Sequence, residues 1–170
     1  SREVTAYYAR VLEADVPLAL DVIGDILLNP SFDKNEIEIE RGVILQEIGQ
    51  ALDTPDDVIF DWLQAQAYPE QPIGRTILGP TERIEAFSRR DLARFVAQHY
   101  GPEEMILSAA GAVDHDSIVK LAEEMFGGMV PTPAFKLAPA KFRGGEVRQV
   151  KDLEQAHFAL GFESPGYRAD

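Results

Sequence analysis

Apolar side chains recur at helical spacing along several stretches of the chain, and the longest stretch covers residues 33–52. There Ile44 and Ile48 fall on one apolar stripe, because an α-helix turns by about 100° per residue. Asp33 suits the N-cap position, and Glu36 three residues later completes a capping box. Caps and spacing of the same kind predict further helices over residues 15–28, 55–67, 81–87, 88–100 and 115–126.

Other stretches show the patterns that are typical of strands. Residues 5–12 are rich in aromatic and β-branched side chains, and residues 105–111 form a short apolar run. Two more strands are predicted at residues 146–150 and 156–163, with His157 on the less apolar face of the second. Together with the helices, these runs predict an α+β fold in which an antiparallel sheet is packed with helices.

Two glutamates, Glu40 and Glu47, stand apart from the other polar residues of the long helix. They are seven residues apart, which is about two turns, so both point almost the same way along the flank of the apolar stripe. A carboxylate at the border of a core is unfavourable unless a metal, a cation or a shared proton compensates it. Border glutamates also commonly extend into water. Spacing alone leaves both interpretations open.

Composition narrows the possible functions. The 170 residues carry a net charge of −13, which disfavours nucleic acid as a partner. This charge would attract a basic peptide, although an ordinary acidic surface is the simpler explanation for it. The absence of cysteine excludes disulfides and thiolate metal sites. No apolar run is long enough to span a membrane. The composition leaves the compartment open, and for a bacterial-type soluble protein we expect the cytoplasm rather than the periplasm.

Several other polar residues have two interpretations. The cluster Asp53, Asp56 and Asp57 suits either helix capping or the orientation of a metal ligand, and capping is the simpler explanation. Arg75 is either a counter-charge to a carboxylate or a solvated loop residue. We expect His99, at a helix C-terminus, to be structural, and His115, in a first helical turn, to be exposed.

The run ERGVILQEI at residues 40–48 resembles the M16 zinc metallopeptidases, the inverzincin group. The flanking runs SREVTAYYARVL and DTPDDVIFDWLQAQAYPEQPIGRTILGP share the resemblance, which favours the processing-peptidase branch of that family. The resemblance implies that Glu47 is the third protein ligand of a catalytic zinc ion. It also implies that Glu40 is a nearby carboxylate that supports catalysis without binding the metal.

The rest of the family's metal site is missing from this sequence. Its two histidine ligands and its general base come from an H-x-x-E-H motif. The three histidines, His99, His115 and His157, do not form one. We therefore expect a fragment that neither retains zinc nor cleaves peptides by itself, since catalytic zinc sites have three protein ligands.

The resemblance also predicts the organisation of the chain and of its parent protein. Residues 1–130 are expected to be the C-terminal part of the first M16-type domain, 131–145 a connector, and 146–170 the start of the next segment. The parent is expected to be a zinc metalloendopeptidase that cleaves unfolded or flexible peptides and works with a second M16 half or a partner subunit, for example as a dimer. The alternative is a non-catalytic M16-like subunit that acts as a scaffold or a peptide-binding partner.

Overall fold

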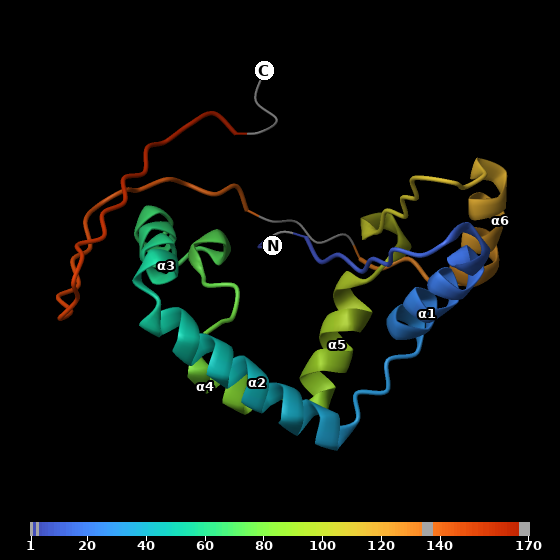
Figure 1. Ribbon diagram of the computed structural model, residues 1–170, viewed down its shortest axis with the longest axis horizontal. Coiled ribbons are helices and arrows are strands. Elements are labelled where there is room, and N and C mark those ends of the chain that lie inside the picture. The colour runs from blue at the N-terminus through green and yellow to red at the C-terminus, as the bar shows by residue number, and fades with distance from the viewer. Residues whose placement is uncertain (1, 3, 134–137, 167–170) are drawn as a thin grey trace. The chain divides into compact units, whose positions relative to one another are not determined.

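The computed structural model describes residues 2, 4–133 and 138–166, and its regular elements are helices (Figure 1). The α-helices are α1 (Val16–Leu28), α2 (Lys34–Asp53), α3 (Pro55–Ala67), α4 (Thr81–Ala86), α5 (Arg89–His99) and α6 (His115–Phe126). Short 3₁₀ helices lie at η1 (Glu13–Asp15), η2 (Pro72–Gly74) and η3 (Pro102–Glu104). Each helix predicted from the sequence is confirmed to within a few residues at its ends.

Local capping explains where several of these helices begin. Asp33 Oδ1 accepts hydrogen bonds from the backbone N–H groups of Asn35, at 2.8 Å, and Glu36, at 3.3 Å, and so caps α2. At the start of α5, Ser88 and Asp91 form the reciprocal bonds of a capping box. These contacts span only two or three residues, so the sequence pattern was sufficient to predict them.

The predicted antiparallel sheet is wrong. The described residues contain no strand, and the four runs predicted as strands are extended chain without a ladder. Alternating side chains determine which face of an extended run is apolar, but a strand also needs the N–H and C=O groups of a partner run. One backbone N–H of the extended chain donates to a helix instead: Arg143 N–H bonds to Ala67 O at the end of α3, at 2.9 Å.

The described chain forms two compact units, of which the first comprises residues 2, 38–86 and 138–166. Its buried apolar side chains belong to Ile48, Val58, Ala67 and Ile84. The extended chain after residue 138 runs along α3, as the orange and red trace beside that helix shows (Figure 1). Three contacts hold this chain in the first unit: Gln66 Nε2 donates to Gly144 O at 3.1 Å, Lys151 Nζ donates to Leu52 O in the last turn of α2 at 2.8 Å, and His157 Nδ1 lies 2.7 Å from Asp56 Oδ1.

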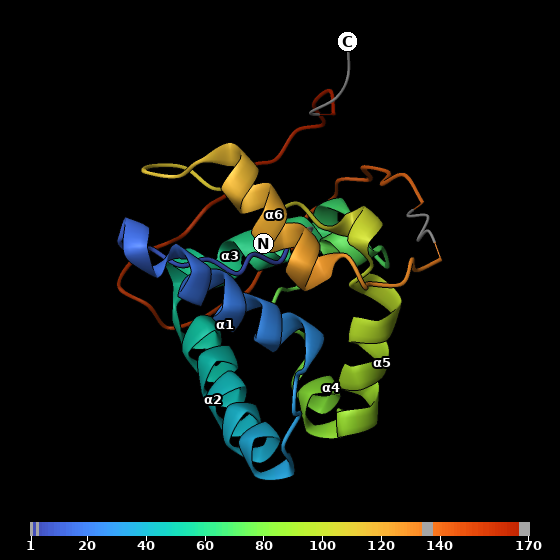
Figure 2. The same ribbon diagram turned by 90° about the vertical axis from the view of Figure 1, so that its right-hand side faces the viewer.

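The second unit comprises residues 4–37 and 87–133. Its helices α1 and α6 pack against each other, and both views show them side by side (Figures 1 and 2). The hydroxyl oxygens of Tyr7 and Tyr100 lie 3.1 Å apart. Burial, assisted by the Tyr100 hydroxyl, raises the pKa of Tyr7 to about 12. The two rings also meet edge to face, with centroids 6.4 Å apart, while Tyr7 stays 43% exposed.

Among the described residues, none of the helices has the length and apolar character that crossing a membrane requires.

Candidate functional site

Helix α2 carries both glutamates that the sequence singled out. Glu40 and Glu47 lie in one uninterrupted helix, about 10 Å apart along its axis, and both side chains are exposed. On the same helix Ile48 is buried, and Ile44 and Leu45 are partly buried, so the apolar stripe packs inward as predicted. The helix thus presents two carboxylates from the edge of a buried stripe. Their roles in metal binding and catalysis stay predictions.

A carboxylate oxygen is a ligand that zinc accepts in proteins, so Glu47 fits one position of a zinc site. One ligand does not make up a site, however. No group of three or more histidine, cysteine, aspartate or glutamate side chains that could hold a metal ion occurs among the described residues. The described residues therefore contain no complete metal site, and the zinc role of Glu47 stays a prediction.

The aspartates around the junction of α2 and α3 do not supply the N-cap of α3, in contrast to the capping prediction. The N-cap residue of α3 is Thr54, and Asp56 and Asp57 lie in the first turn. Carboxylates are favourable there because the N-terminus of a helix carries partial positive charge. Asp56 also pairs with His157, with 2.7 Å between Oδ1 and Nδ1. The sequence held no signal for this pair, because its members are a hundred residues apart.

The other two histidines belong to the second unit. The His99 ring lies against Phe95, with ring centroids 4.6 Å apart, at the end of α5. This ring contact supports the structural role predicted for His99. His115 is exposed in the first turn of α6, as predicted.

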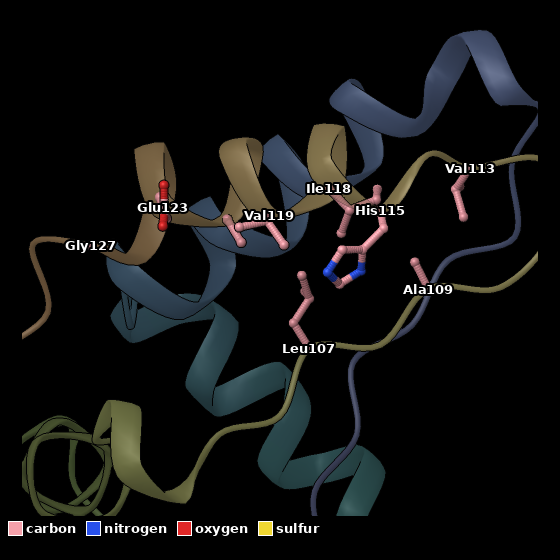
Figure 3. A pocket seen from close by; sticks show the side chains of 9 residues that line it. Leu107, Ala109, Val113, His115, Ile118, Val119, Glu123 and Gly127 are labelled. Atoms are coloured by element: carbon pink, nitrogen blue, oxygen red, sulfur yellow. The ribbon is translucent and has the colours of Figure 1, made fainter.

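A pocket of about 530 Å³ in the second unit lies between α6 and the extended chain before it. Figure 3 shows the His115 ring pointing toward the side of the pocket that carries Leu107 and Ala109. The remaining lining is mostly apolar, with Glu123 as the other titratable residue. Neither Glu40 nor Glu47 lines this pocket.

Arg75 contributes its backbone to the first unit: its carbonyl oxygen accepts a hydrogen bond from Arg2 Nε at 3.2 Å. Arg2 also pairs with Asp61 of α3, with 2.8 Å between Nη2 and Oδ1. The counter-charge role considered for Arg75 stays a prediction.

Arg41 was not singled out by the sequence pattern. Its side chain is only 16% exposed, and its guanidinium donates to the backbone carbonyl of Ile84 in α4 and to the carboxylate of Glu38. Nothing in the sequence around Arg41 indicates that its side chain contacts α4, a helix more than forty residues away.

Two sequence families match this chain. Residues 1–81 match the insulinase family, peptidase family M16, and residues 86–170 match the peptidase M16 inactive domain. The chain therefore belongs to peptidase family M16.

Two relatives illustrate the similarity. The chain is 42% identical to the human mitochondrial-processing peptidase subunit beta over 173 residues, which cover 98% of this chain and 35% of that protein. It is also 42% identical to an "Uncharacterized zinc protease" of Rickettsia bellii over 165 residues, which cover 97% of this chain and 40% of that protein. The chain thus spans well under half the length of these relatives.

Solved structures show similar folds. A putative M16-like peptidase from Alicyclobacillus acidocaldarius matches with a TM-score of 0.57 and 28% identity, over 72% of this chain and 29% of that chain. A protease from Helicobacter pylori matches with a TM-score of 0.67 and 18% identity, over 77% of this chain and 32% of that chain. The second likeness concerns the fold alone.

Proposed function

We propose that this chain is part of a zinc-dependent metalloendopeptidase of the processing-peptidase type. The observation that carries the proposal is the run at residues 40–47, which presents two exposed glutamates from one helix of an M16 chain. The relatives support it by name, since one is a processing-peptidase subunit and the other a zinc protease, each 42% identical to this chain.

In this proposal Glu47 supplies one carboxylate ligand to the zinc ion, and Glu40 supports the reaction from the same side of α2. When bound, zinc polarises a scissile carbonyl and activates a water molecule. The 170 residues contain no H-x-x-E-H run, so the remaining ligands and the general base have to come from outside this sequence.

The proposed substrates are unfolded or flexible peptides. The net charge of −13 favours basic peptides over acidic ones, because opposite charges raise the rate of encounter. A second M16 half or a partner subunit is proposed to complete the enzyme.

The test uses the full-length protein, with and without candidate partner subunits, and a flexible basic peptide as substrate. We expect cleavage that a chelator abolishes and added zinc restores, and much slower cleavage by the Glu47→Gln variant. A matched variant, Glu85→Gln, changes an exposed carboxylate on α4 and should cleave like the wild type. A folded wild-type protein that binds no zinc and cleaves nothing under any of these conditions would instead indicate a non-catalytic M16 subunit.

A further inference from the structure

Helix α2 is held against α4 by Arg41. The Arg41 Nη1 atom donates to the carbonyl oxygen of Ile84, and Ile84 itself is 9% exposed. On its other side the guanidinium faces the Glu38 carboxylate, with 3.2 Å from Nε to Oε2 and 3.4 Å from Nη2 to Oε1. A planar guanidinium that donates in two directions has little freedom to rotate.

The Ile84 carbonyl needs this donor because it lies in the last turn of a six-residue helix. Carbonyl groups at the C-terminus of a helix have no partner within that helix. The N–H group four residues after Ile84 is that of Ser88, which donates to Asp91 Oδ2 at 3.1 Å. Arg41 therefore supplies this carbonyl with a side-chain hydrogen bond from α2.

The position of Arg41 on the helix relates this contact to the two glutamates. Around the axis of α2, Glu40 lies about 100° and Glu47 about 120° from Arg41, on the same side. Any rotation of α2 about its axis would swing both carboxylates together. Functional groups need to be held to within about 10–20° of their working direction, so a contact that prevents this rotation matters to both.

We infer that Arg41 is a positioning residue: by fastening α2 to the Ile84 carbonyl, it sets the direction of the Glu40 and Glu47 carboxylates. The reaction role rests on the proposed function, whereas the orientation of α2 does not depend on it.

The test compares Arg41→Met with Arg83→Met in the full-length protein. Arg83 is an exposed arginine of α4 and serves as the matched control. The orientation is measured by the distance between spin labels on cysteines introduced at Gln46 and Glu82, which are both exposed. We expect Arg41→Met to shift or broaden the distance distribution, Arg83→Met to leave it unchanged, and Arg41→Lys to lie between them.

The reaction role is measured by zinc affinity, in competition with a chromophoric chelator, and by peptide kinetics. Loss of a residue that orients metal ligands reduces affinity or activity by about 10- to 100-fold. We expect Arg41→Met to lower zinc affinity and kcat to this extent, while KM changes much less. All measurements are made well below the melting temperature of each variant.

The possible outcomes separate the two claims. If wild type binds zinc and cleaves peptide, but Arg41→Met matches Arg83→Met in label distance, zinc affinity and kcat, the inference about Arg41 is overturned and the proposed function stands. If wild type neither binds zinc nor cleaves peptide, the proposed function and the reaction role of Arg41 are both overturned. An unchanged label distance in Arg41→Met overturns the claim about α2 in either case.

Discussion

Gly24 of α1 lies directly against Met125 of α6. A Cβ atom added at Gly24 would lie 1.9 Å from Met125 Sδ and 2.7 Å from its Cγ, which is far inside van der Waals contact. Gly24 is a buried residue in the middle of α1, where glycine is otherwise unfavourable in a helix. The close approach of the two helices therefore explains why glycine occupies this position.

Gly24→Ala should destabilise the second unit by no more than about 1 kcal/mol, because the flexible Met125 side chain can turn away and loses only part of its packing, while alanine improves the helix propensity. The free energy of unfolding in urea measures this change. In a Met125→Ala background the steric conflict is absent, and Gly24→Ala should then be neutral or stabilising. An equal loss of stability in both backgrounds would contradict the packing argument.

Val58 is the most buried apolar side chain among the described residues, at 4% exposure in α3. Val58→Ala removes two methyl groups and leaves a cavity, so it should reduce the free energy of unfolding by roughly 1–2 kcal/mol. Phe60, on the same helix, is 64% exposed, and Phe60→Ala should change stability by less than about 0.5 kcal/mol. If Phe60→Ala reduced the free energy of unfolding more than Val58→Ala does, the assignment of Val58 to the inner face of α3 would be wrong.

Two helix caps should make stability depend on acid pH. Hydrogen bonds from the Ser88 hydroxyl and then its backbone N–H hold the pKa of Asp91 below its ordinary value of 3.8, and the corresponding groups of Ser117 do the same for Asp114. A carboxylate with a lowered pKa stabilises the folded state above its ordinary pKa, and this contribution is lost as the pH falls through the folded-state value.

The double variant Asp91→Asn/Asp114→Asn should therefore be less stable than wild type at neutral pH. The difference should shrink as the pH falls below 3.8 and both carboxylates take up protons in the wild type. Unfolding in urea across a series of pH values provides the measurement. A difference in stability that is the same at every pH would show that the charge of the caps contributes nothing.

The helices, and the caps of α2, α5 and α6, were predictable because the interactions that begin them are local. Asp33, Ser88 and Asp114 each accept a backbone N–H from a residue three positions later, so a short window of sequence contains both partners. The strands were not predictable in the same way. The side chains around His157 and Phe158 do alternate, but the apolar face is the exposed one: Phe158 is 82% exposed, whereas His157 is partly buried. The alternation also contains no information about a pairing partner.

In the candidate site, too, local geometry was predictable and contacts between distant residues were not. The relative placement of Glu40 and Glu47 follows from helix geometry, whereas the proposed zinc role of Glu47 rests on resemblance to the M16 family. The contact between Arg41 and Ile84 spans 43 positions, and no pattern within α2 specifies it. Long-range contacts between polar groups could therefore not be predicted from the sequence.

The 170-residue chain by itself should not retain zinc through dialysis against a weak chelator, since Glu47 is its one proposed ligand and a catalytic site has three. It should also fail to cleave a flexible basic peptide, alone or with added zinc. Zinc analysis of the dialysed chain and a peptide assay measure the two properties. Stoichiometric zinc in the dialysed chain would show that it holds a metal site different from the one proposed here.

The central claim is that Glu47 binds the zinc ion of an M16 peptidase, and the zinc content of the full-length protein tests it most directly. Wild type, Glu47→Gln and the control Glu85→Gln are purified, checked for folding and dialysed in parallel. The account predicts stoichiometric zinc in wild type and Glu85→Gln, and largely lost zinc in Glu47→Gln. A folded Glu47→Gln protein that keeps as much zinc as the wild type would contradict it.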